Sequence, residues 1–417
     1  AYDKAIGSVK ERPVKLERKT APELTYMDVY AQDTPNWKKF YVKSSIPEEL
    51  EPLKELSGNL WWCWNQQAEQ LFRMIDPIVW EQAESNPVAL LNRLSYEKLQ
   101  ELKNDAGFME KLRTIHGDFR KYMDASSKKP AESVAYFSME YGLHESVKIY
   151  SGGLGILAGD YLKEASDSNK NLNAVGLMYR YGYFTQSISI FGDQIAESLP
   201  QKYTDLPLQP VRDSEGKWII IGLALPGRTL YAKAWKIAVG RIDLYLLDTD
   251  IEENTMDDRS ITHHLYGGDW HNRFKQELVL GIGGVRLLYA LNIKPTIYHL
   301  NEGHAAFTGM ERLRHLVEEM GFNFGAAKEI IRASSLFTTH TPVPAGHDTF
   351  TEDILRTYIP HYPDRLNISW DDFVNLGKFN KGDHNEKFSM SVLAANLSQE
   401  MNGVSKIHGR VSREMFK

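Results

Sequence analysis

The chain has 417 residues, a formal net charge of −6, and an ordinary globular mix of 42% hydrophobic and 25% charged side chains. That charge argues against nucleic acid or an anionic membrane as the main partner, and the longest apolar run, Leu278 to Leu291, is too short to span a bilayer. The single cysteine, Cys63, excludes an intrachain disulfide and fits a reducing compartment, so we expect a cytoplasmic protein.

The first third of the chain predicts an arm followed by a helical subdomain. Residues 1–45 mix charges and prolines with little periodicity, which indicates an irregular N-terminal arm. Residues 46–130 place leucines at helical spacing, and pairs such as Asp76-Pro77 are typical helix starts. We expect the tryptophans of the cluster Trp61-Trp62-Cys63-Trp64 to pack inward, with sugar stacking as the alternative.

Beyond residue 130 the pattern becomes α/β. A buried strand at 133–139 leads to a glycine-rich loop and a helix ending near Asn169. Residues 207–248 alternate by twos between turn pairs, which predicts an antiparallel β insertion, with strands at 207–212, 218–224, 229–239 and 241–248. From Thr296 onward strands and helices alternate, which is typical of a parallel sheet. We therefore expect residues 131–417 to form a Rossmann-like α/β domain.

The glycine loop carries the first candidate site. Gly152, Gly153 and Gly155 allow a tight turn before a helix whose apolar face includes Leu154. Free N–H groups at a helix start, with the helix dipole behind them, form an anion site, so the loop suits a phosphate. A ligand-free turn between loop and helix remains the alternative, because short glycine motifs often match by chance.

Two strand ends and one loop carry the other candidates. Asn301, Glu302 and His304 follow the strand at 296–300, and His340 follows the strand at 335–339. Because ligands in open α/β sheets bind outside the carboxyl ends of the strands, these residues could converge with the glycine loop on one cleft. The loop Tyr266-Gly-Gly-Asp269 could move over that cleft. Histidines near it lack any zinc-site spacing, so we expect no metal.

Several motifs, taken together and in order, resemble those of the glucan phosphorylases. The glycine loop and its flanking strands, Arg273-Phe-Lys-Gln-Glu277, and both strand-end histidine motifs resemble elements of that family, as does Met401-Asn-Gly-Val-Ser-Lys-Ile-His408. The stretch from Leu56 to Asn65 resembles the extra N-terminal helical region of a shorter bacterial and archaeal branch. No match is visible to the phosphoserine and nucleotide-effector elements of the animal enzymes.

The resemblance implies an architecture and a set of roles. It implies one half of a two-domain, double-Rossmann (GT-B) glycosyltransferase, with the Schiff-base lysine in a second domain that would begin where this chain ends, at Lys417. It assigns Gly152 and Gly153 to the cofactor, Gly153 and Leu154 to phosphate and substrate, and His340 to the reacting glucosyl ring. It also implies a sugar pocket lined by Asp269, Asn301, Glu302 and His304.

The resemblance further implies a reaction for the whole enzyme. Pyridoxal phosphate, held by the full-length enzyme and not by this chain alone, would serve through its 5′-phosphate as an acid/base partner of inorganic phosphate. An α-1,4-glucan such as glycogen, starch or maltodextrin would then release α-glucose 1-phosphate with retention. We expect the 417-residue chain alone to be inactive. A sugar-nucleotide-dependent glucan synthase and a non-catalytic glucan-binding module are the alternatives, and a homo-oligomer is compatible with the sequence.

Overall fold

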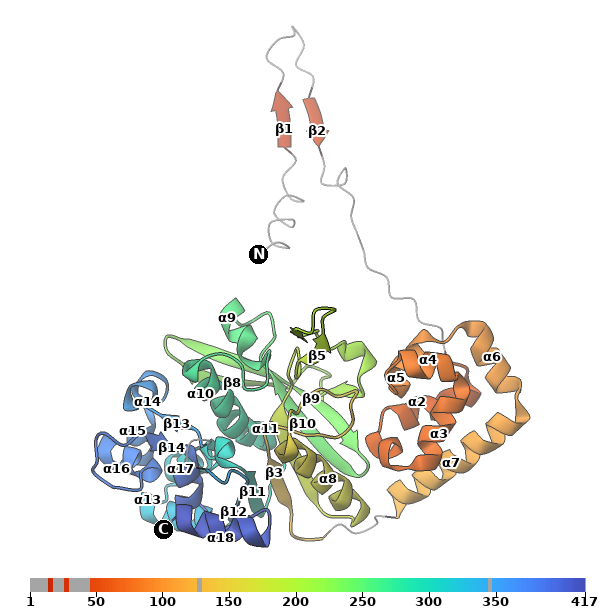
Figure 1. Ribbon diagram of the computed structural model, residues 1–417. Helices are drawn as coiled ribbons and strands as arrows, with labels where there is room; N and C mark the ends of the chain where they lie inside the picture. Colours follow the sequence, from red (N-terminus) through yellow and green to blue (C-terminus); the bar gives the residue numbers. More distant parts are fainter. Residues whose placement is uncertain (1–13, 18–25, 30–45, 126–129, 344–346, 417) are drawn as a thin grey trace. The chain divides into compact units, whose positions relative to one another are not determined.

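The computed structural model describes residues 14–17, 26–29, 46–125, 130–343 and 347–416 (Figure 1). It divides into two compact units, residues 1–45 and 46–417. In the first unit, β1 (Val14–Glu17) pairs antiparallel with β2 (Tyr26–Val29). The rest of the arm predicted at residues 1–45 lies outside the described residues.

The second unit opens with a group of helices drawn in orange in Figure 1. Asn59, Asn65, Asp76, Asn86, Ser95 and Asp105 each cap a helix start by accepting a hydrogen bond from a backbone N–H of the first turn. The elements are η2 (Glu48–Leu50), α2 (Glu51–Ser57), η3 (Leu60–Trp64), α3 (Gln66–Ile75), α4 (Pro77–Gln82), α5 (Pro87–Arg93), α6 (Tyr96–Asn104) and α7 (Ala106–Asp124).

Two of the three tryptophans of the cluster pack inward as predicted, whereas Trp64 is only partly buried and its Nε1 donates to Asp167 Oδ1 at 3.3 Å. Trp61 and Trp62 are buried, and the Trp62 ring meets Phe72 and Trp80 edge to face with ring centroids 6.1 Å apart in both pairs. Asn59 joins this helical group to the sheet, because its side chain donates to the Gly240 carbonyl oxygen (2.9 Å) and accepts from the Gly240 N–H (2.8 Å). The rings of Trp61 and Trp62 therefore belong to the core.

A nine-stranded mixed sheet forms the centre of the α/β region, with strand order β15-β12-β11-β3-β4-β10-β9-β7 and β8 paired to β9. Its parallel strands are β3 (Val134–Phe137), β4 (Leu172–Leu177), β10 (Ile242–Asp248), β11 (Ile297–Asn301), β12 (Ser335–Thr339) and β15 (Glu400–Gly403). The fold is thus α/β with a parallel-dominated sheet, as expected.

The antiparallel part differs from the predicted insertion at one strand. β7 (Leu208–Pro210) and β8 (Ile220–Leu225) pair antiparallel with β9 (Arg228–Val239), which pairs antiparallel with β10. β10, however, lies parallel to β4, with Leu244 opposite Ala174. The predicted antiparallel pairing of residues 241–248 is therefore confirmed at the β9 edge but not at the other edge, where this almost wholly buried strand joins the parallel sheet. Two small hairpins complete the strands, β5 (Thr185–Ile188) with β6 (Gln194–Glu197), and β13 (Thr349–Phe350) with β14 (Phe388–Ser389).

Helices connect the strands and cover the sheet. One long helical segment consists of α10 (Trp270–Leu278), a π-helical turn η6 (Val279–Gly283) and α11 (Gly284–Ala290). A Cβ on Gly281 would lie 2.7 Å from Phe307 Cβ, so the glycine permits the close approach of α12. The remaining elements are η4 (Tyr203–Asp205), α8 (Gly153–Asp167), α9 (Met256–Arg259), η5 (Ser260–Thr262), η7 (Gly303–Ala305), α12 (Phe307–Arg314), η8 (His315–Glu319), α13 (Phe324–Ala333), α14 (Glu352–Tyr358), α15 (Tyr362–Leu366), α16 (Trp370–Val374), η10 (Asn375–Gly377), α17 (Met390–Asn396) and α18 (Lys406–Met415). Among the described residues, none of these helices is both long and apolar enough to cross a membrane.

Candidate active site

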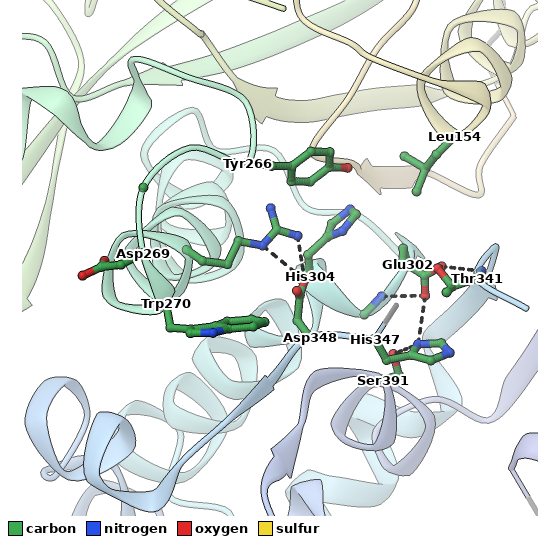
Figure 2. A pocket seen from close by; sticks show the side chains of 13 residues that line it. Leu154, Tyr266, Asp269, Trp270, Glu302, His304, Thr341, His347, Asp348 and Ser391 are labelled. Atoms are coloured by element: carbon green, nitrogen blue, oxygen red, sulfur yellow. Dashed lines mark hydrogen bonds and ion pairs between the residues drawn. The ribbon is translucent and has the colours of Figure 1, made fainter. Parts of the chain in front are cut away.

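A cavity of about 400 Å³ lies where the carboxyl ends of the parallel strands meet. β3, β11 and β12 are neighbours in the sheet and run in the same direction, so the segments that follow them gather at one edge. Figure 2 shows most of the lining side chains facing one another, whereas the carboxylate of Asp269 points away and caps the start of α10. The lining residues are Leu154, Tyr266, Gly268, Asp269, Trp270, Arg273, Glu302, Gly303, His304, Thr341, His347, Asp348 and Ser391.

The start of α8 beside this cavity presents backbone donors. The N-cap residue Gly152 offers no side chain, and the first N–H with a helical acceptor is that of Ile156, which donates to the Gly152 carbonyl oxygen at 3.2 Å. Among the described residues, the N–H groups of Gly153, Leu154 and Gly155 have no hydrogen-bond acceptor. A Cβ on Gly152 or Gly153 would meet nothing within 4 Å. We call residues 151–155 the amide turn, and its geometry suits an anion.

Glu302 holds the end of β12 in place. Its Oε2 accepts hydrogen bonds from the backbone N–H groups of His340 (2.8 Å) and Thr341 (2.9 Å) and from the Thr341 hydroxyl (3.0 Å). The Glu302 backbone is strained, with φ +72° and ψ 170°, a conformation that residues other than glycine rarely adopt. Such strain persists only where surrounding contacts enforce it, and here the hydrogen bonds of the Glu302 carboxylate are those contacts.

A charge cluster forms one wall of the cavity. The Arg273 guanidinium lies 2.6 Å from Asp348 Oδ2 and 3.2 Å from Glu277 Oε1, the second contact being an ion pair without hydrogen-bond geometry. Burial, aided by the nearby Asp348 charge, raises the pKa of Glu277 well above its usual value. Burial also acts to raise the pKa of Asp348, but Arg273 outweighs it and the pKa is lowered. The two carboxyl groups beside Arg273 thus have their pKa values shifted in opposite directions.

His304 is held as a neutral imidazole at the centre of the site (Figure 2). It is 3% exposed, and burial, with the neighbouring Arg273 charge, lowers its pKa to about 3. Its Nε2 accepts a long hydrogen bond from the Met139 N–H (3.4 Å). A neutral, packed ring suits sugar binding better than proton transfer near neutral pH.

The predicted site residues divide into two groups. Leu154, Asp269, Glu302 and His304 line the cavity, and Gly152 and Gly153 precede Leu154 in the amide turn. Asn301 and His340 are not among the lining residues. Asn301 is fully buried and donates to the Ser138 hydroxyl at 3.1 Å.

His340 lies just past the strand end that Glu302 fixes. Burial lowers the pKa of its imidazole, although the Glu302 charge acts in the opposite direction. Its Nε2 is buried and has no hydrogen-bond partner among the residues that the structure describes.

Sequence reasoning placed Tyr266, Trp270 and Arg273 within candidate motifs but gave them no individual role, as it gave none to the lining residues Thr341, His347, Asp348 and Ser391. Arg273 stood inside a motif quoted for its resemblance, but nothing nearby in sequence marks Asp348, which lies 75 positions away, as its partner. His347 and Ser391 meet through a 2.6 Å contact between Nδ1 and Oγ, again across a long stretch of chain. Tyr266 has a positive φ of 54°, which could not be predicted from the neighbouring residues in the sequence.

Comparison with known proteins identifies relatives of the whole chain. It is 43% identical to the maltodextrin phosphorylase of Thermococcus litoralis over 387 residues, which cover 90% of this chain and 45% of the relative. It is 42% identical to the glycogen phosphorylase of Mycobacterium tuberculosis over 91% of this chain and 46% of that protein. The chain is a relative of the glycogen and maltodextrin phosphorylases.

Two further findings refine this relationship. The glycogen phosphorylase of Aquifex aeolicus is 37% identical over 88% of this chain and 53% of its own length. The chain thus spans about half the length of these curated relatives. A family model described as "Protein of unknown function (DUF3417)" matches residues 46–147, which include the helical group and β3.

Proposed function

We propose that this chain supplies one wall of the active site of an α-1,4-glucan phosphorylase, which releases α-glucose 1-phosphate from glycogen, starch or maltodextrin. One observation carries the proposal, namely an amide turn with three unpartnered N–H groups beside a polar cavity. The turn suits a phosphate and the cavity suits a glucosyl unit, and the names of the relatives favour phosphorolysis over synthesis from a sugar nucleotide.

We assign roles to the predicted residues according to their positions. Gly153 and Leu154 would donate backbone hydrogen bonds to phosphate, with Gly152 leaving space for it. Asp269 and His304 would contact sugar hydroxyls from the cavity wall. Substrate positioning and charge stabilisation, without a protein nucleophile, would accelerate the reaction.

Three further residues act at the strand ends. His340 would bind the reacting glucosyl ring, since its backbone N–H is occupied by Glu302 and its imidazole Nε2 is free. Glu302 would line the pocket while its carboxylate fixes that strand end. For Asn301 we propose support of the site from behind, because its side chain is buried against Ser138.

The residues of this chain fit a phosphate group, and we propose that pyridoxal phosphate serves the full-length enzyme. The amide turn is a phosphate cradle whose glycines leave open space, and the lining of the cavity includes no lysine that could form a Schiff base. When bound, the cofactor would supply a phosphate as proton donor and acceptor for the substrate phosphate. The chain's own part would be to orient the glucosyl unit and to hold phosphate at Gly153 and Leu154.

We further propose that the region 131–417 is one of two Rossmann-like domains of a GT-B enzyme, with 46–130 as a helical subdomain. The cavity would then be only one side of the catalytic cleft. The 417-residue chain alone is accordingly expected to lack phosphorolytic activity, because the opposite side carries the cofactor lysine.

The test is an assay of the full-length protein that contains this chain, loaded with pyridoxal phosphate. Maltodextrin and inorganic phosphate should yield glucose 1-phosphate, whereas UDP-glucose or ADP-glucose with maltodextrin should yield no chain extension. Extension from the sugar nucleotide without phosphorolysis would favour a synthase. Turnover by residues 1–417 alone would contradict the division of the cleft.

A further inference from the structure

Glu140 is a buried carboxylate with no role in the function proposed above. It follows β3, is 3% exposed, and lies directly beneath the amide turn. Its Oε2 accepts hydrogen bonds from the backbone N–H groups of Ser151 (2.8 Å) and Gly152 (3.3 Å). These two donors immediately precede the three that remain unpartnered. Glu140 therefore fixes the direction of the peptide groups that lead into the anion site.

The other carboxylate oxygen of Glu140 contacts the opposite side of the cavity. Oε1 accepts a short hydrogen bond from the Tyr266 hydroxyl. Burial, together with the Glu140 charge, raises the pKa of Tyr266 well above its usual value, so this phenol remains a donor. Tyr266 begins the loop Tyr266–Asp269, which we call the cavity loop, and three of its residues line the cavity.

The Glu140 side chain thus forms a hydrogen-bonded bridge between the amide turn and the cavity loop. The two ends of this bridge are rigid for different reasons. At the amide turn, a Cβ on Gly155 would lie 2.9 Å from Glu140 Oε2 and 2.5 Å from Tyr150 Cβ, so only glycine allows α8 to sit this close. At the cavity loop, Tyr266 has a positive φ of 54° and its ring packs against the Arg273 guanidinium, 4.4 Å from ring centroid to carbon. A carboxylate clamped between two such segments transmits a displacement of one to the other.

We propose that Glu140 is a positioning residue that couples the amide turn to the cavity loop, so that ordering of the loop around a sugar strengthens phosphate binding at Gly153 and Leu154. The inference rests on the proposed function for the identity of its ligands. The coupling itself depends only on the contacts of Glu140. Loss of the Tyr266 hydroxyl leaves Glu140 Oε1 without this donor and lets the carboxylate move. The hydrogen bonds from the Ser151 and Gly152 N–H groups to Oε2 are then weakened.

Charge decides which variant tests this cleanly. Glu140→Gln removes a negative charge next to the anion site, which by itself favours phosphate, while its amide can keep weaker versions of the same contacts. Tyr266→Phe breaks the bridge and leaves every charge in place. Tyr245→Phe is the matched control, because the Tyr245 hydroxyl on β10 lies outside the cavity lining and its one hydrogen bond among the described residues goes to Asp243 Oδ2 at 3.5 Å.

The first measurement is hydrogen exchange, which needs no activity. In the full-length protein, Tyr266→Phe should speed exchange of the Ser151 and Gly152 amides by about fivefold or more, since a hydrogen bond to a charged acceptor is weakened. Tyr245→Phe should leave those amides unchanged. Equal exchange at Ser151 and Gly152 in the wild type and Tyr266→Phe would overturn the coupling, whether or not the protein is a phosphorylase.

The second measurement is kinetic. Tyr266→Phe should raise KM for phosphate by about fivefold with a smaller change in kcat, and this rise should be clearly smaller in a Glu140→Gln background. Equal effects of Tyr266→Phe in both backgrounds would show that the tyrosine acts without Glu140 and would overturn the proposal. A wild type without phosphorolysis would refute the proposed function and leave the exchange result to decide the coupling.

Discussion

The helical group at residues 46–125 and the carboxyl edge of the sheet follow opposite rules. In the helical group, six helix starts have a side-chain cap and the large rings are buried against one another. At the sheet edge, α8 begins without a side-chain cap, Glu302 and Tyr266 hold positive φ, and an arginine with two carboxylates is buried. The helical group is not free of strain, since Glu84 and Ser85 also hold positive φ and the indole nitrogens of Trp62 and Trp80 lack hydrogen-bond partners among the described residues. The two regions differ in the capping of their helix starts and in the buried charge cluster of the sheet edge. That difference is typical of a structural region beside a functional one.

The largest expected effect comes from removing the cation of the buried charge cluster. Arg273→Met should destabilise the protein by about 3–5 kcal/mol, because Asp348 is left buried without its partner. Urea unfolding measures the loss. Lys54→Ala is the control, since both side chains of its ion pair with Glu51 are exposed, by 66% and 54%, and it should cost less than about 1 kcal/mol. Equal costs would show that the sheet edge does not depend on its buried charges.

A comparable loss of stability in the helical group should leave the chemistry intact. Trp62→Ala removes a ring that is 1% exposed and should cost about 3–5 kcal/mol in unfolding free energy. If the helical group is structural, the folded fraction of this variant should keep the wild-type KM for phosphate. A selective rise in the KM for phosphate would show that the helical group takes part in the site and would contradict its purely structural role.

Acid should act on the sheet edge through His304. Its folded pKa of about 3 lies below the unfolded value, so below about pH 6.5 the unfolded chain binds the proton and the folded protein does not. Stability should therefore fall as the pH drops, with a contribution from His304 of about 2 kcal/mol between pH 7 and pH 5. In His304→Asn, urea titrations at the two pH values should differ by correspondingly less. An unchanged pH dependence would show that His304 is not held neutral.

The smallest effects on stability separate the two kinds of helix start. Asp76→Ala removes hydrogen bonds to Ile78 and Val79 and should cost about 1 kcal/mol without affecting the KM for phosphate. Gly153→Ala has room for its methyl group and should keep or slightly raise stability, by up to about 1 kcal/mol, while raising that KM. The reverse pattern, a destabilised Gly153→Ala with normal phosphate kinetics, would contradict an anion site at the amide turn.

The same contrast explains how far the sequence predicts the molecule. Strand β12, Ser335–Thr339, and the helix start at Asp76 follow from local patterns, because alternation, caps and proline positions act over a few residues. The place of β10 in the parallel sheet could not be read locally, since a strand after a hairpin has the same alternation whichever neighbour it joins. The polar residues at the strand ends were also predicted from local patterns, whereas the residues that contact them were not.

Partners that are distant in sequence account for what was missed at the site. Arg273 with Asp348, His347 with Ser391 and Glu140 with Tyr266 are separated by tens of residues or more, so no spacing rule connects them. Asn301 shows the opposite kind of error. Its position at a strand end predicted a contact with a ligand, but its side chain is buried in the core, and local sequence does not distinguish the two cases.

Phosphate binding at the amide turn is the central claim, and a titration of the isotope-labelled full-length protein with inorganic phosphate tests it most directly. The account predicts saturable shifts of the Gly153, Leu154 and Gly155 amide signals, with none at the side-chain-capped start of α4. Unchanged signals from the three amides at saturating phosphate, in a protein whose other signals show it to be folded, would contradict the account.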